Sequence, residues 1–214
     1  MKIPTFVIAL LLFTSCAQSQ NADVKIPLGS TKKGAPGEQV AYFSEGCFWH
    51  AELVFQSLVG VRDAVSGYAG GTDNDPSYEK VASGTTGHAE TVEVFYDPAK
   101  ISYETLVKAF FASQDPTELN RQGNDVGTEY RSIAFYQSDA QKAAIQAEVD
   151  RLSQSHKYKS PIVTQVVPFK HFYKAESYHQ EYIYYNPDNP YVQSVSIPEW
   201  LEFKRTFKDA AFKS

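Results

Sequence analysis

Cysteine is scarce in this sequence, which has only Cys16 and Cys47 among 214 residues. If Cys16 is removed or modified during export, as argued below, the folded part keeps one thiol. One cysteine cannot form an internal disulfide. The presence of only one cysteine also excludes a cysteine-based structural zinc site, because such sites need four nitrogen or sulfur ligands. A single unpaired thiol in an exported domain needs a reason. Cys47 is therefore either chemically reactive or simply a small buried hydrophobic residue.

Basic runs and long apolar runs are also missing. The formal net charge is −5, and charges of both signs are interspersed along the chain. This distribution argues against a nucleic-acid-binding surface. The one extended apolar segment, residues 3–13, follows Lys2 and is too short to span a bilayer. It predicts a signal peptide over residues 1–15, and no other segment is expected to cross a membrane.

The end of this segment, LFTSC at residues 12–16, resembles the lipobox of bacterial lipoproteins, with Phe13 where an aliphatic residue is commoner. The resemblance implies cleavage before Cys16 and lipid attachment to that cysteine. The protein would then be an exported, membrane-anchored lipoprotein on the periplasmic side of the bacterial cell envelope. Ordinary secretion, with cleavage after the small residues 15–17, is the alternative.

The remaining sequence divides into a polar stretch and one folded domain. Residues 16–38 are polar and contain Gly, Pro, Ser and Lys, which predicts a flexible tether. Residues 39–214 have ample apolar and aromatic content for a core. Strand and helix patterns alternate there, which predicts an α/β or α+β layered domain with a mixed sheet. We expect strands over 40–44, 61–65, 89–96, 130–136 and 162–167. Helices are expected over 47–58, 138–154 and 172–185, two more are expected to start at Ser102 and Pro198, and a single helical turn is expected at 77–81. Two loops are also expected, a mobile glycine-rich loop over 67–76 and a polar loop over 117–128.

Cys47 is predicted to lie where a strand turns into a helix. Residues 40–44 have the apolar, β-branched and aromatic character of a buried strand, and Cys47 then shares one helical face with Ala51 and Phe55. Gly60 is expected to end this helix.

That position has chemical consequences for the thiol. The free N–H groups and the positive end of the helix dipole favour an anion, so we expect a lowered pKa for Cys47. The neighbouring Phe48 and Trp49 are expected to form an apolar pocket beside it.

Glu90 is the candidate partner of the thiol. In the strand 89–96 it shares a face with Val92, Val94 and Tyr96. Desolvation on an apolar face raises a carboxyl pKa, and a neutral acid beside a thiolate can act as a general acid. Alternatively, Glu90 is solvated at a fraying strand end.

Six motifs, taken together and in order, resemble the peptide methionine sulfoxide reductase A family. They are Gly46-Cys-Phe-Trp49, Gly67-Tyr-x-Gly-Gly71, Pro76-Ser-Tyr78, Gly87-His-Ala-Glu90, Gln122-Gly-Asn-Asp-x-Gly-Thr128 with Tyr130-Arg131, and Tyr178-His-Gln180. They span about residues 40–208. His50 stands where glycine is common in the family.

The resemblance implies a ferredoxin-like two-layer α/β sandwich with a mixed sheet and long coil segments. It also implies reduction of methionine-S-sulfoxide, free or in proteins, as repair of oxidative damage. No metal or other cofactor is implied. The implied roles are nucleophile for Cys47, methyl-group binding for Phe48 and Trp49, protonation of the sulfoxide oxygen by Glu90, hydrogen bonds to that oxygen from Tyr78 and Tyr130, and support of the site by Asp125.

The sequence departs from the family at the resolving cysteine that many relatives carry near the C-terminus. Their segment resembles residues 189–193 (NPYVQ) here, and this chain has Val192 at the cysteine position. We therefore expect a single-cysteine reductase whose sulfenic acid is reduced by an external thiol, such as a thioredoxin-like partner in the cell envelope.

Two other functions stay open at this point. One is a thiol peroxidase that uses Cys47, which would need a cationic partner such as Arg near the thiol. The other is a non-catalytic envelope lipoprotein that binds methionine-containing segments through its aromatic pocket.

Overall fold

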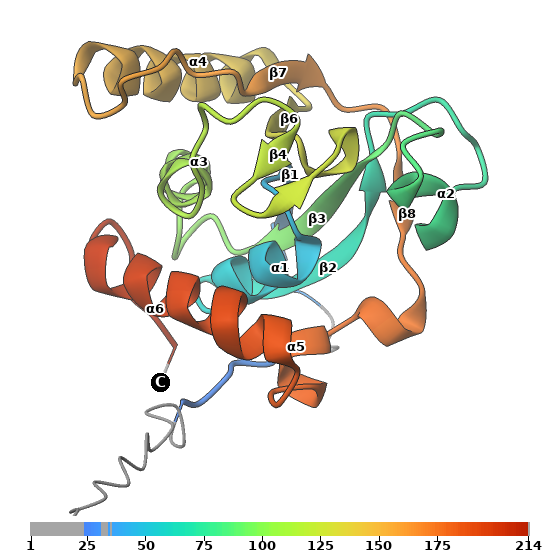
Figure 1. Ribbon diagram of the computed structural model, residues 1–214. Coiled ribbons are helices and arrows are strands. Elements are labelled where there is room, and N and C mark those ends of the chain that lie inside the picture. Colours follow the sequence, from blue (N-terminus) through green and yellow to red (C-terminus); the bar gives the residue numbers. More distant parts are fainter. Residues whose placement is uncertain (1–23, 31–33, 35, 214) are drawn as a thin grey trace, which may run out of the picture.

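Figure 1 shows a computed structural model of the chain, which describes residues 24–30, 34 and 36–213. The expected signal peptide at 1–15 and the expected lipid attachment site Cys16 lie outside the described residues. Within the described part, no helix combines the length and hydropathy needed to cross a membrane.

A mixed six-stranded sheet forms the centre of the molecule, with strand order β7-β6-β1-β3-β2-β8. Its strands are β1 (Gln39–Ser44), β2 (Val61–Ala69), β3 (Ala89–Tyr96), β6 (Ile133–Tyr136), β7 (Gln165–Pro168) and β8 (Phe172–Lys174). Only β6 and β7 pair in parallel, and every other neighbouring pair is antiparallel.

The four central strands have the ferredoxin-like arrangement. Helix α1 (Phe48–Gln56) connects β1 to β2, and α3 (Tyr103–Ala112) lies between β3 and β6 in the chain. The resulting β-α-β-β-α-β order, with antiparallel strands β6-β1-β3-β2, is the ferredoxin-like motif. The predicted fold class is confirmed.

Helices cover one face of this sheet (Figure 1). The remaining helical segments are α2 (Tyr78–Ala82), α4 (Asp139–Gln154), α5 (Tyr182–Tyr185), α6 (Ile197–Thr206), the 3₁₀ turns η1 (Thr128–Tyr130) and η2 (Ser177–His179), and the π-helical turn η3 (Val192–Ser196). On the helix-covered face the ring of Phe43 stacks between those of Phe55 and Phe110, each 5.1 Å away between centroids. A smaller apolar cluster on the opposite face includes Tyr42, which stacks on Phe169 at 3.7 Å.

Local signals located several elements well. Ser102 accepts a hydrogen bond from the backbone N–H of Thr105 and caps α3, and Ser138 accepts one from Gln141 and caps α4. These are the caps expected of helices with serine at the start. Strand β3 has the predicted bounds.

Two segments differ from the predictions. Gly67 to Ala69 belong to β2, where they pair with β3 and β8, and are not part of a mobile loop. A Cβ at Gly67 would collide with Phe172 and with the carbonyl of Tyr173. Glycine here lets β8 approach and pair with β2. The helix predicted over 172–185 is instead β8, η2 and α5, and Glu181, just before α5, has a left-handed backbone conformation with φ 54°.

Smaller differences concern the ends of elements and the loops. Helix α1 ends at Gln56, and Gly60, with φ +101°, makes a separate turn into β2. The predicted polar loop 117–128 carries a hairpin of β4 (Arg121–Gln122) and β5 (Asp125–Val126). Part of the predicted tether contacts the domain, since the N–H of Gly29 donates to the Glu181 carboxylate at 3.0 Å.

Candidate active site

Cys47 occupies the N-cap of α1, one residue before the first helical turn. Its carbonyl accepts the N–H groups of His50 and Ala51 at 3.1 and 3.2 Å. The preceding Gly46 has φ +91°, and a Cβ there would lie 2.7 Å from the Cβ of Gln122. Glycine is therefore required for the turn that brings the thiol against the β4–β5 hairpin.

The protonation state of Cys47 differs from the prediction. Part of the residue remains exposed, but burial of the sulfur raises the pKa of the thiol well above its usual range, and the carboxylates of Glu90 and Asp125 raise it further. The N–H groups of Trp49 and His50 lower this pKa, as expected at a helix N-terminus, but their effect is smaller. The prediction of a readily ionised thiol is wrong, and the free site holds a protonated Cys47.

Glu90 lies on the helix-covered face of β3 and is 3% exposed. Its Oε2 accepts the backbone N–H of Phe48 at 2.9 Å, which places the carboxyl directly beside the start of α1. Burial raises the pKa of Glu90 to about 8, with smaller contributions from Asp125 and Glu129. The carboxyl is therefore mostly neutral at pH 7, and it is not solvated at a strand end.

Tyr78 and Tyr130 supply two phenol groups to the same place. Tyr78 begins α2 and Tyr130 ends η1. Burial raises the pKa of Tyr78 to about 12 and also raises the pKa of Tyr130. Both phenols therefore keep their protons and can donate hydrogen bonds.

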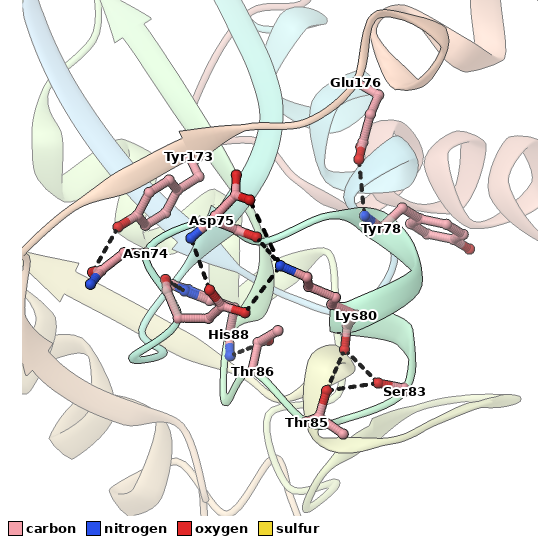
Figure 2. Close-up of polar contacts among 11 residues, drawn as sticks. Asn74, Asp75, Tyr78, Lys80, Ser83, Thr85, Thr86, His88, Tyr173 and Glu176 are labelled. Atoms are coloured by element: carbon pink, nitrogen blue, oxygen red, sulfur yellow. Dashed lines mark hydrogen bonds and ion pairs between the residues drawn. The ribbon is translucent and has the colours of Figure 1, made fainter.

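Helix α2 is held in place by Glu176, as Figure 2 shows. Its Oε1 accepts the N–H of Tyr78 at 3.0 Å, and its Oε2 accepts the hydroxyl of Tyr68 on β2 at 2.8 Å. The loop that precedes α2 is tied to it by Lys80, whose ammonium donates to the carbonyl of Asp75 at 2.6 Å. Tyr78 is thus positioned by a connection between α2, β2 and the segment before η2.

One cavity of about 180 Å³ brings these groups together; we call it the substrate cavity. It is lined by Cys47, Phe48, Trp49, Tyr78, Glu90, Asp125, Tyr130 and Tyr191. Every site residue predicted within the described part is among them. The volume lies below the roughly 300–1,000 Å³ of typical small-molecule pockets, so the cavity suits a single side chain.

The aromatic wall of the cavity is fixed by packing. The ring of Trp49 stacks on Tyr182 at 3.7 Å, and its indole N–H donates to Nδ1 of His179 at 3.1 Å. Phe48 is fully buried and packs 4.9 Å from the His179 ring. The wall beside Cys47 is therefore rigid and apolar.

Sequence reasoning missed Tyr191. Its hydroxyl donates to Oδ2 of Asp125 at 2.6 Å and interacts with Cys47, so that a residue from just before η3 reaches the thiol. The NPYVQ segment stands out for its missing cysteine, but no local pattern indicates where its tyrosine points.

Comparisons with known proteins agree with this geometry. A family model described as peptide methionine sulfoxide reductase matches residues 39–211. Peptide methionine sulfoxide reductases of Mesorhizobium japonicum and Rhodopirellula baltica are each 45% identical over 177 residues, covering 82% and 83% of this chain and 91% of each relative. The chain belongs to the peptide methionine sulfoxide reductase family.

Solved structures of the family support the same conclusion. Mxr1 from Saccharomyces cerevisiae in its reduced form matches with a TM-score of 0.67 at 36% identity, covering 76% of this chain and 93% of that one. Methionine sulfoxide reductase A of Corynebacterium diphtheriae matches with a TM-score of 0.66 at 32% identity, covering 75% and 82%. The resemblance drawn from the six motifs is confirmed, and the chain is an enzyme with peptide methionine sulfoxide reductase activity.

Proposed function

We propose that this enzyme reduces methionine-S-sulfoxide, free or in proteins, with Cys47 as nucleophile and Glu90 as proton donor. The observation that carries the proposal is the convergence of a thiol, a neutral carboxyl and two protonated phenols in one side-chain-sized cavity. The S-epimer follows from the family resemblance, because a separate enzyme type acts on each epimer.

The chemistry requires this combination. A sulfoxide oxygen leaves poorly until it is protonated, so Glu90 gives it a proton while the hydroxyls of Tyr78 and Tyr130 donate hydrogen bonds to it. The Cys47 sulfur attacks the substrate sulfur, and the Glu90 carboxylate formed by the first transfer accepts the thiol proton. The sulfur–oxygen bond of the substrate then breaks, the protonated oxygen passes to the Cys47 sulfur, and methionine leaves. The sulfoxide gains two electrons, and Cys47 loses two and becomes a sulfenic acid.

The sulfenic acid is then reduced by an external thiol, for which a thioredoxin-like protein of the cell envelope is the proposed source. Val192, at the place of the resolving cysteine of many relatives, is fully buried at the start of η3. Once Cys16 is acylated or removed, Cys47 is the one remaining cysteine of the sequence, so a second thiol then comes from another molecule.

The two other functions lack support. Among the described residues, neither cavity that contains Cys47 is lined by Arg or Lys, whereas a thiol peroxidase would need such a cation. Membership in an enzyme family argues against a non-catalytic binding protein.

A single-turnover experiment tests the proposal. Protein without reductant is mixed with one equivalent of separated S- or R-sulfoxide, and methionine release and the mass of the Cys47 peptide are measured. We expect one methionine per enzyme from the S-epimer only, with one oxygen added to Cys47, and none from Cys47→Ser. Turnover of the R-epimer, or a Cys16–Cys47 disulfide in the native protein, would contradict it.

We further propose that the protein is a lipoprotein of the cell envelope, anchored through Cys16. The support is the LFTSC sequence after the short apolar segment. Labelling with a radioactive fatty acid should mark the wild type and not Cys16→Ser, and the variant should leave the membrane fraction. Equal labelling of both would exclude the anchor.

A further inference from the structure

A second cavity reaches Cys47 from a different side; we call it the polar cavity. It also measures about 180 Å³, and its lining includes Glu45, His50, Ser113 and Glu199. It shares only Cys47, Asp125 and Tyr191 with the substrate cavity. The Tyr191–Asp125 hydrogen bond and the Cys47 side chain thus form the partition between the two cavities.

Buried polar groups without partners distinguish the polar cavity. Glu45 is 1% exposed, and its Oε2 accepts from the Ser113 hydroxyl at 3.0 Å while its Oε1 has no partner. His50 is 5% exposed, and neither of its ring nitrogens has a hydrogen bond of good geometry. Such groups cost free energy unless something occupies the site. Neither residue takes part in sulfoxide reduction as described above.

The protonation states of these two residues complement each other. Burial lowers the pKa of His50 to about 4, and the carbonyls of Ser113 and Ser196 oppose this only in part. Burial raises the pKa of Glu45 well above its usual range. At neutral pH the cavity therefore holds a free-base imidazole beside a carboxyl that keeps its proton to higher pH than usual, with the carboxyls of Asp125 and Glu199 also on its lining.

The chemistry of the oxidised enzyme needs a second approach to Cys47. The oxygen taken from the substrate is bound on the side of Glu90, Tyr78 and Tyr130. A thiolate that displaces oxygen from sulfur attacks in line with the breaking bond, and so arrives from the side opposite the oxygen. The polar cavity contacts Cys47 and is lined by none of those three residues.

We propose that the reducing thiol reaches Cys47 through the polar cavity and gives its proton to His50. This inference rests on the proposed function, because it requires a Cys47 sulfenic acid. Nothing in the family comparison assigns a role to Glu45 or His50.

The step balances as follows. The incoming thiol gives its proton to His50, which passes it on to water because its pKa is about 4. The thiol sulfur bonds to Cys47 while the sulfur–oxygen bond of the sulfenic acid breaks. The leaving oxygen takes a proton from Glu90 and departs as water. A second thiol attacks the sulfur of the first in the mixed disulfide, its proton restores the acid form of Glu90, and Cys47 leaves as a thiolate that takes a proton from water. Two thiols are oxidised to one disulfide, and Cys47 returns to the thiol.

The lining also selects among thiols. Asp125 and Glu199 are acidic, and no Arg or Lys lines the cavity within the described part of the chain. A neutral or amine-bearing thiol group should therefore react faster than one next to a negative charge. Cysteamine, dithiothreitol and 2-mercaptoethanesulfonate test this order, and a purified thioredoxin tests whether a protein cysteine uses the same path.

The decisive measurement separates the two half-reactions. Enzyme oxidised with one equivalent of sulfoxide is mixed with dithiothreitol, and recovery of the Cys47 thiol is followed. His50→Ala should lower the second-order rate constant about 10²-fold, within the range of a lost general base, and leave methionine release in the first half-reaction within about two-fold. Exposed His171 lines neither cavity, so His171→Ala should match the wild type in both.

The pH dependence distinguishes proton transfer from a structural effect. Without a base in the cavity only thiol that is already ionised reacts, so recovery of His50→Ala should rise about tenfold per pH unit below the thiol pKa. Recovery of the wild type should rise less steeply.

A second variant guards against misfolding of the first. Ser194 lies on the exposed rim of the polar cavity, so Ser194→Trp narrows the opening without changing the core. It should slow recovery with dithiothreitol at least about tenfold, again with unchanged methionine release. Wild-type recovery rates in both variants, or in Ser194→Trp if His50→Ala does not fold, would overturn the inference. Absence of methionine release from the wild type would instead overturn the proposed function.

Discussion

Cys47 and Glu90 both keep their protons in the free enzyme, and the same cause acts on both. Burial raises the pKa of the thiol and of the carboxyl, and an ionised Glu90 raises the pKa of Cys47 further. A site that must protonate an oxygen and attack a sulfur benefits from this, because the acid is available at neutral pH. The Cys47 thiol becomes a nucleophile only as its proton moves to the Glu90 carboxylate, which forms when Glu90 protonates the sulfoxide oxygen.

Replacing Glu90 with Gln should therefore change two rates in opposite directions. Methionine release in a single turnover should fall about 10²-fold to 10⁴-fold, because the general acid is lost. Alkylation of Cys47 by iodoacetamide near pH 9 should become faster, because removal of the negative charge lowers the pKa of the thiol. Slower alkylation together with slower release would mean that the variant had damaged the site as a whole.

The wild-type reaction should also lose speed at alkaline pH. The acid form of Glu90 disappears as the pH rises through its pKa of about 8, so the rate of methionine release should fall above that pH. A pH series of single turnovers with saturating S-sulfoxide measures this. A rate that keeps rising with pH would show that thiol ionisation, and not the acid, limits the reaction.

At the scale of elements, the position of Tyr78 depends on the Glu176 connection between α2 and β2. Glu176→Ala removes both hydrogen bonds, and hydrogen bonds to a charged group contribute about 1.5–3 kcal/mol each. We expect methionine release to slow about tenfold, with most of the rate restored in Glu176→Gln, which keeps an acceptor for the Tyr78 N–H.

Ser102→Ala is the matched control for that experiment. It removes the cap of α3, which typically costs about 1 kcal/mol of stability, and Ser102 does not line the substrate cavity. Its rate should equal that of the wild type. If it slows the enzyme as much as Glu176→Ala does, the effect comes from general loss of stability.

Elements whose determinants are local could be predicted, and those that depend on a distant segment could not. The caps at Ser102 and Ser138 and the alternation of β3 are properties of adjacent residues. The strand extends through Gly67 because it pairs there with β3 on one side and, in the register Gly67–Lys174, with β8 on the other, more than a hundred residues later. Local composition instead favoured a loop there.

The site follows the same rule. Motifs identified the residues that line the substrate cavity, because each motif is a short run of sequence. The pKa of Cys47 was predicted wrongly, because it depends on burial and on charges brought from β3 and from the β4–β5 hairpin. The polar cavity could not be predicted for the same reason, since its lining combines residues from the end of β1, from α1, from the end of α3 and from α6.

At the scale of the whole molecule, buried carboxyls make stability depend on pH. Glu52 on α1 is 3% exposed, and it accepts hydrogen bonds from the Ser66 hydroxyl at 2.8 Å and from the Glu181 N–H at 3.1 Å. Burial nevertheless raises the pKa of Glu52 to about 8, as it does for Glu90. These groups join α1 to β2, β3 and the turn before α5, so their protonation affects the centre of the fold.

The direction of the effect follows from the pKa values. For a carboxyl whose pKa is raised from 4.5 to about 8 on folding, the folded state holds its proton more tightly than the unfolded state. Its contribution to stability is complete below about pH 4.5 and is lost as the pH rises through about 8. The free energy of unfolding should therefore fall between about pH 5 and pH 8, by up to about 1.4 kcal/mol per pH unit for each such group.

Glu52→Gln should remove the part of this fall in the free energy of unfolding that Glu52 causes, because glutamine stays neutral and can still accept a hydrogen bond from Ser66. Urea unfolding at about pH 5, 7 and 9 should give a shallower loss of stability for the variant than for the wild type. Glu202, which is exposed and paired with Arg205 on α6, has its pKa lowered by that pair, so Glu202→Gln should keep the wild-type slope in this range. Equal slopes for wild type and Glu52→Gln would mean that Glu52 is not protonated in the folded protein at pH 7, and that α1 rests on a buried charge instead of a neutral hydrogen-bonded acid.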